Sequence, residues 1–110
     1  MNNREVYIAI LYHSALDSNL IKEVCAGLEE EGVSFSLKEC DKANSFTELG
    51  NIAADMSPLN VGIGIDQFGN LCVHHEKLNL EEPYIRDIVQ NGRKSGKNAA
   101  RLVKGLPLSF

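Results

Sequence analysis

One apolar run near the start of the chain decides the fold: Val6-Tyr7-Ile8-Ala9-Ile10-Leu11-Tyr12. The run is rich in β-branched and aromatic residues and shows no polar alternation, which is typical of a strand buried on both faces. Such a strand needs helices above and below it and further strands on both edges. We therefore predict a central strand over residues 6–12, with its covering helices and partner strands later in the sequence.

A helix and an edge strand are predicted directly after this run. Apolar residues recur at helical spacing over residues 17–31 and predict an amphipathic helix. Asp17 and Ser18 are candidate N-caps for this helix, and Gly32 is a natural residue at which to end it. Residues 33–37 then alternate apolar and polar side chains, which suits a half-exposed edge strand.

A capping box, formed by Ser45 and Glu48, marks the start of a second helix. We expect this helix to end just before Pro58, because the residue before a proline is disfavoured in a helix. Residues 61–65 alternate Val and Ile with glycines and, together with residues 71–75, predict a β-hairpin. The glycines do not fit a dinucleotide-binding motif. They are expected instead to let a helix pack closely over the strand.

The last third of the chain is less regular. Residues 84–89 fit either a short helix or a fifth strand. Gly92 and Gly96 are interpreted as loop residues, followed by a short helix over residues 98–104 that Gly105 ends. The order of elements predicts an α/β fold. We expect a three-layer sandwich with a mixed, mostly parallel sheet of about five strands, one of them antiparallel.

Length and composition are those of an ordinary globular domain. The chain has 110 residues, of which 44% are hydrophobic and 24% charged, and we predict a single domain over residues 1–110. No apolar run approaches the ~18 residues that a membrane span needs. The start, Met1-Asn2-Asn3-Arg4-Glu5, lacks the basic-then-apolar order of a signal peptide. We therefore expect a cytoplasmic protein that does not bind membranes.

Charge is unevenly distributed along the chain. The net charge is −4, yet residues 93–104 carry five cations and no acid, so the remainder amounts to −9. An acidic body argues against nucleic-acid binding, which needs a broad cationic face. The basic stretch is interpreted first as a solvated helix face, with a docking surface for an acidic partner or an anion as the alternative.

Three acids, Glu29, Glu30 and Glu31, lie in the last turn of the first predicted helix. Negative charge is unfavourable at that position, because the helix dipole is itself negative at the C-terminus. A plain solvated helix end explains the cluster, and a site that meets a cation is the alternative.

The cysteines and the paired histidines do not make a convincing reactive or metal site. Cys25, Cys40 and Cys72 lack the spacing of a metal site or of a C-x-x-C pair. Cys25 and Cys72 lie in apolar patterns and are interpreted as small buried hydrophobes. His74 and His75 point to opposite faces of a strand, so a half-buried structural histidine is preferred to a metal ligand.

His13 follows the first strand at the carboxyl end, where α/β sheets place their ligands. Ser14 and Asp17 lie nearby, but no nucleophile elbow supports a Ser-His-Asp set. Asp66 is expected to hydrogen-bond its own turn. The residues alone therefore predict a protein that binds another chain rather than an enzyme.

Three stretches, in this order, together span most of the chain from first to last: Gly27–Phe35, Ser57–Asp66 with its continuation to His75, and Asn98–Pro107. Together they resemble the small subunit of the reactivating factors of diol and glycerol dehydratases. The third stretch is the most specific, and the segment between Glu81 and Gly96 matches least.

The resemblance implies the fold of the dehydratase medium subunit, which is similar to anticodon-binding domains. It also implies a non-catalytic subunit of an ATP-dependent molecular chaperone that acts on adenosylcobalamin-dependent dehydratases. This subunit is expected to exchange with a dehydratase subunit, so that damaged cobalamin is released. The implied partners are the dehydratase and a large ATPase subunit, in an α2β2 heterotetramer that is cytoplasmic or associated with a bacterial microcompartment.

The resemblance further implies a role for the acidic helix end. Glu30 would complete, in trans, the magnesium site of the large subunit, which itself binds ATP or ADP, and this chain would hold no cofactor of its own. Glu29 and Glu31 would contact the partner beside it. Arg101 and Lys104 are predicted either to contact the partner or to anchor the last helix.

Two other functions remain as alternatives. A dehydratase medium-subunit homologue with a structural role would share the same fold. A small phosphocarrier-type enzyme would use His13 or Cys40, but His13 is followed by little of the amide-rich loop that binds an anion.

Overall fold

The structure is a computed structural model that describes residues 6–108, so the segment on which the signal-peptide prediction rests lies outside the described residues. The strands are β1 (Ile8–His13), β2 (Phe35–Cys40), β3 (Val61–Ile65), β4 (Asn70–His75) and β5 (Ile85–Ile88). The helices are α1 (Ser18–Glu30), α2 (Phe46–Met56) and α3 (Gly92–Lys104), with a short 3-10 helix, η1 (Val89–Asn91), before α3. None of the helices described is long and apolar enough to cross a membrane.

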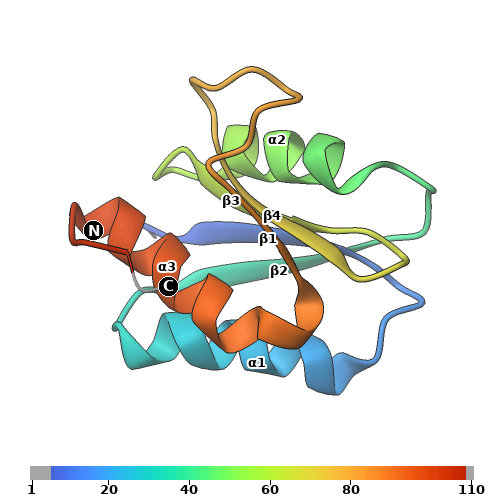
Figure 1. The fold of residues 1–110 in the computed structure, drawn as a ribbon, viewed down its shortest axis with the longest axis horizontal. Helices are drawn as coiled ribbons and strands as arrows, with labels where there is room; N and C mark the ends of the chain where they lie inside the picture. Colours follow the sequence, from blue (N-terminus) through green and yellow to red (C-terminus); the bar gives the residue numbers. More distant parts are fainter. Residues whose placement is uncertain (1–5, 109–110) are drawn as a thin grey trace, which may run out of the picture.

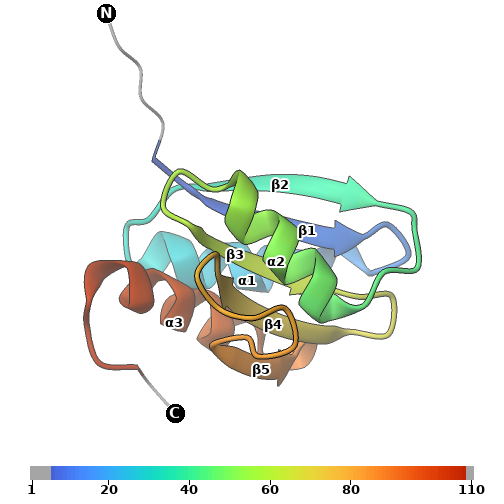
Figure 2. The same cartoon turned by 90° about the horizontal axis from the view of Figure 1, so that it is seen from above.

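The five strands form one sheet in the order β2-β1-β3-β4-β5, with α1 and α3 on one face and α2 on the other (Figure 1). β1 pairs in parallel with β2 and β3, whereas β4 runs antiparallel to β3 and β5. Figure 2 shows β2 and β5 at the two edges, with α2 lying across the middle of the sheet. The predicted three-layer α/β sandwich with one antiparallel strand is confirmed.

The first two helices form where their sequence signals lie, and the central strand forms over residues 8–13 rather than 6–12. Ile8 and Ile10 of β1 are fully buried, as the apolar run predicts. Asp17 is the N-cap of α1, because its side chain accepts a hydrogen bond from the amide of Asn19. Ser45 and Glu48 form both hydrogen bonds of the capping box at the start of α2. The edge strand β2 begins two residues later than predicted and continues to residue 40.

Glycines bring α2 into direct contact with β3. A methyl group added at Gly64 would lie 2.1 Å from the backbone nitrogen of Gly50, and one at Gly62 would lie 2.2 Å from that of Ala54. Neither strand position therefore has room for a side chain while the helix keeps this distance. The predicted close packing of a helix over these glycines is confirmed.

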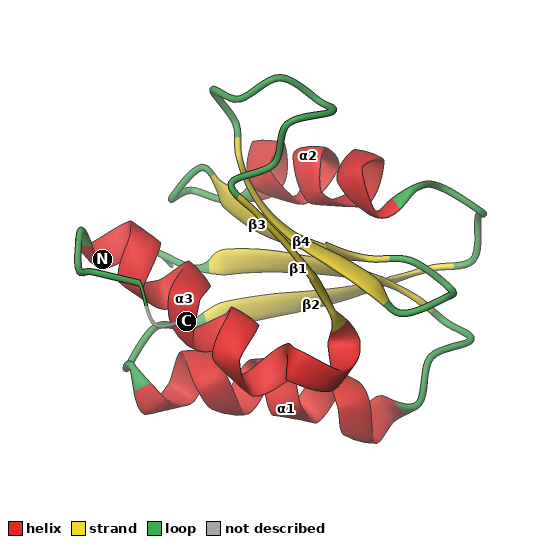
Figure 3. Ribbon diagram, in the orientation of Figure 1, coloured by secondary structure: helices red, strands yellow, loops and turns green. Residues whose placement is uncertain are grey.

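The last third of the chain resolves one open choice and corrects one expectation (Figure 3). Residues 85–88 form the fifth strand, which resolves the choice between strand and helix. The interpretation of Gly92 and Gly96 as loop residues was wrong, because α3 begins at Gly92 rather than at residue 98. A methyl group at Gly96 would lie 2.1 Å from the carbonyl oxygen of Val24, so this glycine lets α3 pack on the backbone of α1. The contact outweighs the usual cost of about 1 kcal/mol for glycine inside a helix.

Candidate functional site

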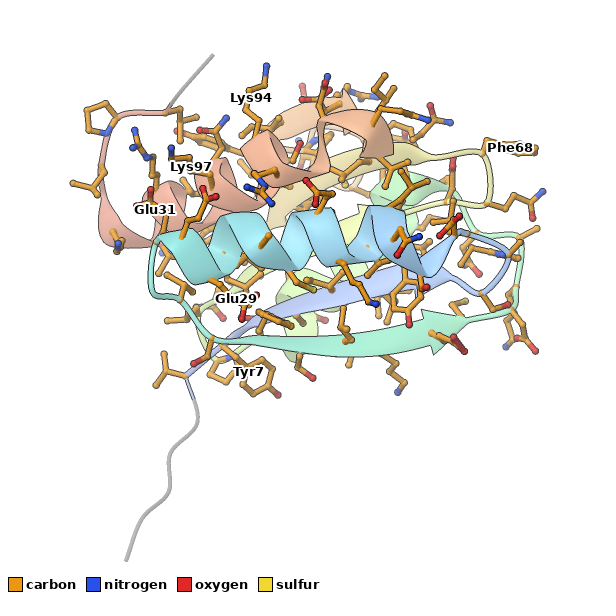
Figure 4. The ribbon with its side chains drawn as sticks, turned by 90° about the horizontal axis from the view of Figure 1, so that it is seen from below. Tyr7, Glu29, Glu31, Phe68, Lys94 and Lys97 are labelled. Carbon is orange, nitrogen blue, oxygen red and sulfur yellow. The ribbon has the colours of Figure 1, made fainter. Side chains whose placement is uncertain are left out.

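The acidic end of α1 meets the basic flank of α3. All four ion pairs found within residues 6–108 join acids of α1 and its C-cap to bases of α3. Figure 4 shows Glu29 and Glu31 at one end of α1, with Lys94 and Lys97 on the adjacent helix. The basic stretch is therefore largely compensated within the chain and is not simply a solvated helix face.

Arg93 bridges two acids of α1. Its Nε and Nη2 atoms lie 3.2 and 3.4 Å from the two carboxylate oxygens of Glu23. Its Nη1 atom donates a hydrogen bond of 3.0 Å to Oε2 of Glu30. The other oxygen of Glu30, Oε1, has no hydrogen-bond partner in the described part of the chain. Glu30 is thus half engaged within the chain and half available to another ligand.

The carboxylate of Glu31, by contrast, contacts two bases of α3. Its carboxylate lies 3.4 Å from Nε of Arg101 and 3.4 Å from Nζ of Lys104, and only 13% of its side chain is exposed. Desolvation raises the pKa of this carboxyl, but Lys104 and Arg101 outweigh it and hold the pKa below its usual range. Lys104 also donates to the backbone oxygen of Glu31, which places a cation at the negative end of the helix dipole.

Glu29 has no ion-pair partner among residues 6–108, although it lies in the same turn. It borders an open depression of about 450 Å³ that residues 32–35 also line. The three adjacent acids therefore differ. Glu31 pairs with two bases of α3, Glu30 pairs through one of its two oxygens, and Glu29 is exposed. Arg101 and Lys104 serve as anchors of α3 in this structure, and their contact with a partner stays a prediction.

The other sequence candidates do not form a joint site. His13 accepts a hydrogen bond through Nδ1 from the amide of Ala15, as a loop residue would. Cys40 lines a second depression with Ser14, Glu39 and Asp41. Two acids beside the thiol would repel a phosphoryl group, which weakens the phosphocarrier alternative.

Both buried cysteines are hydrophobes, as predicted. Burial raises the pKa of Cys25 to about 11 and that of Cys72 to about 12, so both thiols are protonated at neutral pH. His74 is fully buried rather than half-buried, because the β4–β5 connection folds back onto it. Its ring nitrogens lie 3.0 and 3.2 Å from the backbone oxygens of His75 and Leu80. No group of three or more potential metal ligands occurs in the described part of the chain.

The β3–β4 turn lies at the far end of the molecule from the acids of α1 (Figure 4). Asp66 accepts hydrogen bonds of 2.9 Å from the amides of Phe68 and Asn70, so the predicted turn role is confirmed. Phe68 is 80% exposed on this ordered turn, and the sequence analysis did not single it out.

Sequence analysis also missed the pairing of Arg93 with Glu23 and Glu30. A signal was present, because Arg93, Lys97 and Arg101 recur every four residues and so mark one face of a helix that begins before residue 98.

Comparison with known proteins gives a consistent answer. The family described as the dehydratase medium subunit matches residues 7–109. The probable glycerol dehydratase-reactivating factor small subunit of Citrobacter freundii is 34% identical, over 93% of this chain and 92% of its own length. The diol dehydratase-reactivating factor small subunit of Klebsiella michiganensis is 38% identical, over 96% of this chain and 86% of its own length.

Solved structures agree with these relatives. A structure of glycerol dehydratase reactivase superposes with a TM-score of 0.90 at 34% identity, covering 96% of this chain and 97% of the other. A structure of diol dehydratase-reactivating factor complexed with ADP and Mg2+ gives a TM-score of 0.86 at 37% identity, covering 97% and 100%. The chain therefore belongs to the dehydratase medium-subunit family, as a small subunit of the diol and glycerol dehydratase-reactivating factors.

Proposed function

We propose that this chain is the non-catalytic, partner-binding subunit of a chaperone that reactivates an adenosylcobalamin-dependent dehydratase. In this proposal the large subunit hydrolyses ATP, and the small subunit leaves it to exchange with a subunit of the dehydratase. Damaged cobalamin is then released from the loosened enzyme. Membership of the dehydratase medium-subunit family supports the exchange step, because a shared fold lets one chain take the place of another.

The observation that carries this proposal is the half-engaged carboxylate of Glu30. Arg93 holds one of its oxygens, and the other has no partner within residues 6–108. Mg2+ prefers oxygen ligands and is usually bound by one or two carboxylates together with phosphates and water. A solved relative holds ADP and Mg2+. Glu30 is therefore suited to give a single ligand to a magnesium ion on the large subunit.

Other residues are assigned around this contact. Glu29 binds the large subunit beside Glu30, and Glu31, Arg101 and Lys104 remain predicted contacts that also keep α3 in place. The assembly is an α2β2 heterotetramer, and nucleotide is bound by the large subunit. We propose a cytoplasmic location, with association with a bacterial microcompartment as the alternative.

The direct test is the affinity of this subunit for its large subunit in magnesium and ADP, measured for Glu30→Gln and for Asp55→Asn. Asp55 is an exposed acid of α2 on the opposite face of the sheet, so it controls for the loss of one charge. We expect Glu30→Gln to bind at least roughly tenfold more weakly, since even outer contacts to a metal ligand are worth 10–100-fold. Unchanged affinity for Glu30→Gln would refute the magnesium contact.

A structural medium subunit of a dehydratase is the second candidate, because the family model itself describes that subunit. Purification of the tagged chain from its host, followed by mass measurement of intact complexes, separates the two. A stoichiometric complex with an ATPase subunit supports the reactivating factor. Recovery with dehydratase subunits alone would support the medium-subunit role instead.

A further inference from the structure

We infer that Arg93 is a positioning residue for the proposed magnesium contact. It holds Oε2 of Glu30 and leaves Oε1 as the oxygen that meets the cation. This inference rests on the proposed function, because it concerns the same helix end, but it assigns a role to a residue of the other helix.

The backbone of Arg93 is fixed against α1. A methyl group added at Gly27 would lie 2.1 Å from the carbonyl oxygen of Arg93 and 2.7 Å from the amide nitrogen of Lys97. The two helices are therefore in backbone contact at this point, and α3 cannot approach or slide without a clash. The side chain of Arg93 therefore extends from a helix backbone that is packed on α1, not from a loop.

The side chain of Arg93, although 53% exposed, contacts two acids of α1. Glu23 receives two parallel contacts from the guanidinium, of 3.2 and 3.4 Å, and Glu30 receives a third, of 3.0 Å. Glu23 and Glu30 are seven residues apart, which is two helical turns, so both carboxylates lie on the same face of α1. The planar fork of an arginine suits this arrangement, whereas the single ammonium group of a lysine does not.

This arrangement has the chemistry of an outer-shell contact to a metal ligand. A hydrogen bond to the oxygen that does not bind the metal orients the carboxylate and restricts its rotation before the cation arrives. The guanidinium has only N–H donors and no acceptor, so it binds the carboxylate without competing for the cation. Glu23 has a second effect, because its charge cancels that of Arg93 and limits repulsion between the guanidinium and the cation.

The experiment measures how much magnesium strengthens binding between this subunit and its large subunit, as the ratio of Kd in EDTA to Kd in Mg2+, with ADP present in both. Arg93→Gln should lower this ratio roughly tenfold, as expected for loss of an outer-shell contact. Arg93→Lys should not restore it, and Glu23→Gln should lower it by a smaller factor. In a Glu30→Gln background, Arg93→Gln should cause no further loss.

Lys94→Gln is the matched control. It removes the same charge from the neighbouring position of α3, and Lys94 has no ion pair among the described residues. Its ratio should equal that of the wild type. An equal loss of affinity with and without magnesium in Arg93→Gln would overturn the inference, since a merely structural residue acts in both conditions.

The outcomes also separate this inference from the proposed function. If Glu30→Gln abolishes the magnesium effect while Arg93→Gln preserves it, only the role of Arg93 is wrong. If neither substitution alters the ratio, the magnesium contact itself is wrong. Circular dichroism and thermal unfolding check that each variant is folded, and Glu23→Gln tests the arrangement with Arg93 retained.

Discussion

Both faces of the sheet use glycine to bring elements close together, but among residues 6–108 ion pairs occur on one face alone. On one face, glycines let α2 lie directly on the sheet, and on the other they let α3 lie directly on α1. The positions are Gly50, Gly62 and Gly64 on the first face and Gly27, Gly92 and Gly96 on the second. The same packing device therefore occurs twice, with different surroundings.

The difference shows how packing can position charge. Around α2 the close contact is surrounded by buried apolar residues such as Leu49 and Ala53, and it serves the fold. Between α1 and α3, the close contact determines which base meets which acid, because the ion pairs lie along its edge. In that region a change in helix distance alters the candidate site as well as the stability.

Gly64→Ala is expected to have the largest effect on stability. Its methyl group would meet backbone atoms of Gly50 and Phe46 at 2.1 and 2.4 Å, so α2 must move off the sheet. We expect a loss of about 3 kcal/mol, at the upper end for overpacking of a core, measured by urea unfolding. A loss below about 1 kcal/mol would mean that α2 is not held at this distance.

Gly96→Ala is expected to lower the free energy of unfolding less than Gly64→Ala does, and to lower the affinity for the large subunit more. The clash with the carbonyl oxygen of Val24, at 2.1 Å, is offset in part by the helix propensity of alanine, worth about 1 kcal/mol. We expect a net loss of about 1–2 kcal/mol. The folded variant should also bind the large subunit more weakly. Equal weakening by Gly64→Ala would contradict the distinction between the two faces.

Ser45→Ala tests the α2 face with a milder change. Loss of the side-chain acceptor for the amide of Glu48 should cost about 1 kcal/mol in urea unfolding. Affinity for the large subunit should stay at the wild-type value, because this cap lies on the opposite side of the sheet from α3. Weaker binding would connect α2 to the site.

Glu31→Gln should have the smallest effect, and one that depends on pH. The pKa of Glu31 is lowered in the folded state, so its stabilising contribution is complete above the ordinary glutamate pKa of about 4.3. The contribution is lost as pH falls through the lower folded-state value. The difference in Tm between wild type and variant should therefore disappear in acid. A constant difference at all pH values would show that packing, not charge, is responsible.

Much of the fold could be predicted because its signals are local. The capping box at Ser45, the apolar run of β1 and the alternation of β3 each depend on neighbouring residues. The start of α3 was missed although basic residues recur at helical spacing from residue 93, because Gly92 and Gly96 have the local signature of a loop. Their helical conformation depends on contact with α1, which is distant in sequence.

The candidate site was predictable only in outline. The acids at Glu29–Glu31 were noticed because they oppose the helix dipole, and the resemblance assigned Glu30 to a cation. The different states of the three acids depend on where α3 lies. Arg93 and Glu23 were missed for the same reason, since their meeting requires both helices in place.

The order of the strands also affects how the nascent chain folds during translation. β1 is synthesised early but is an interior strand of the sheet, where it pairs with β3 and shares its covered face with α3. Such non-local contacts form late and leave apolar surface exposed in the nascent chain. Because α3 supplies Arg93, an interrupted translation product that lacks this helix cannot present Glu30 in its anchored form. On the proposed magnesium contact, we expect assembly with the large subunit to favour chains that have been completed through α3.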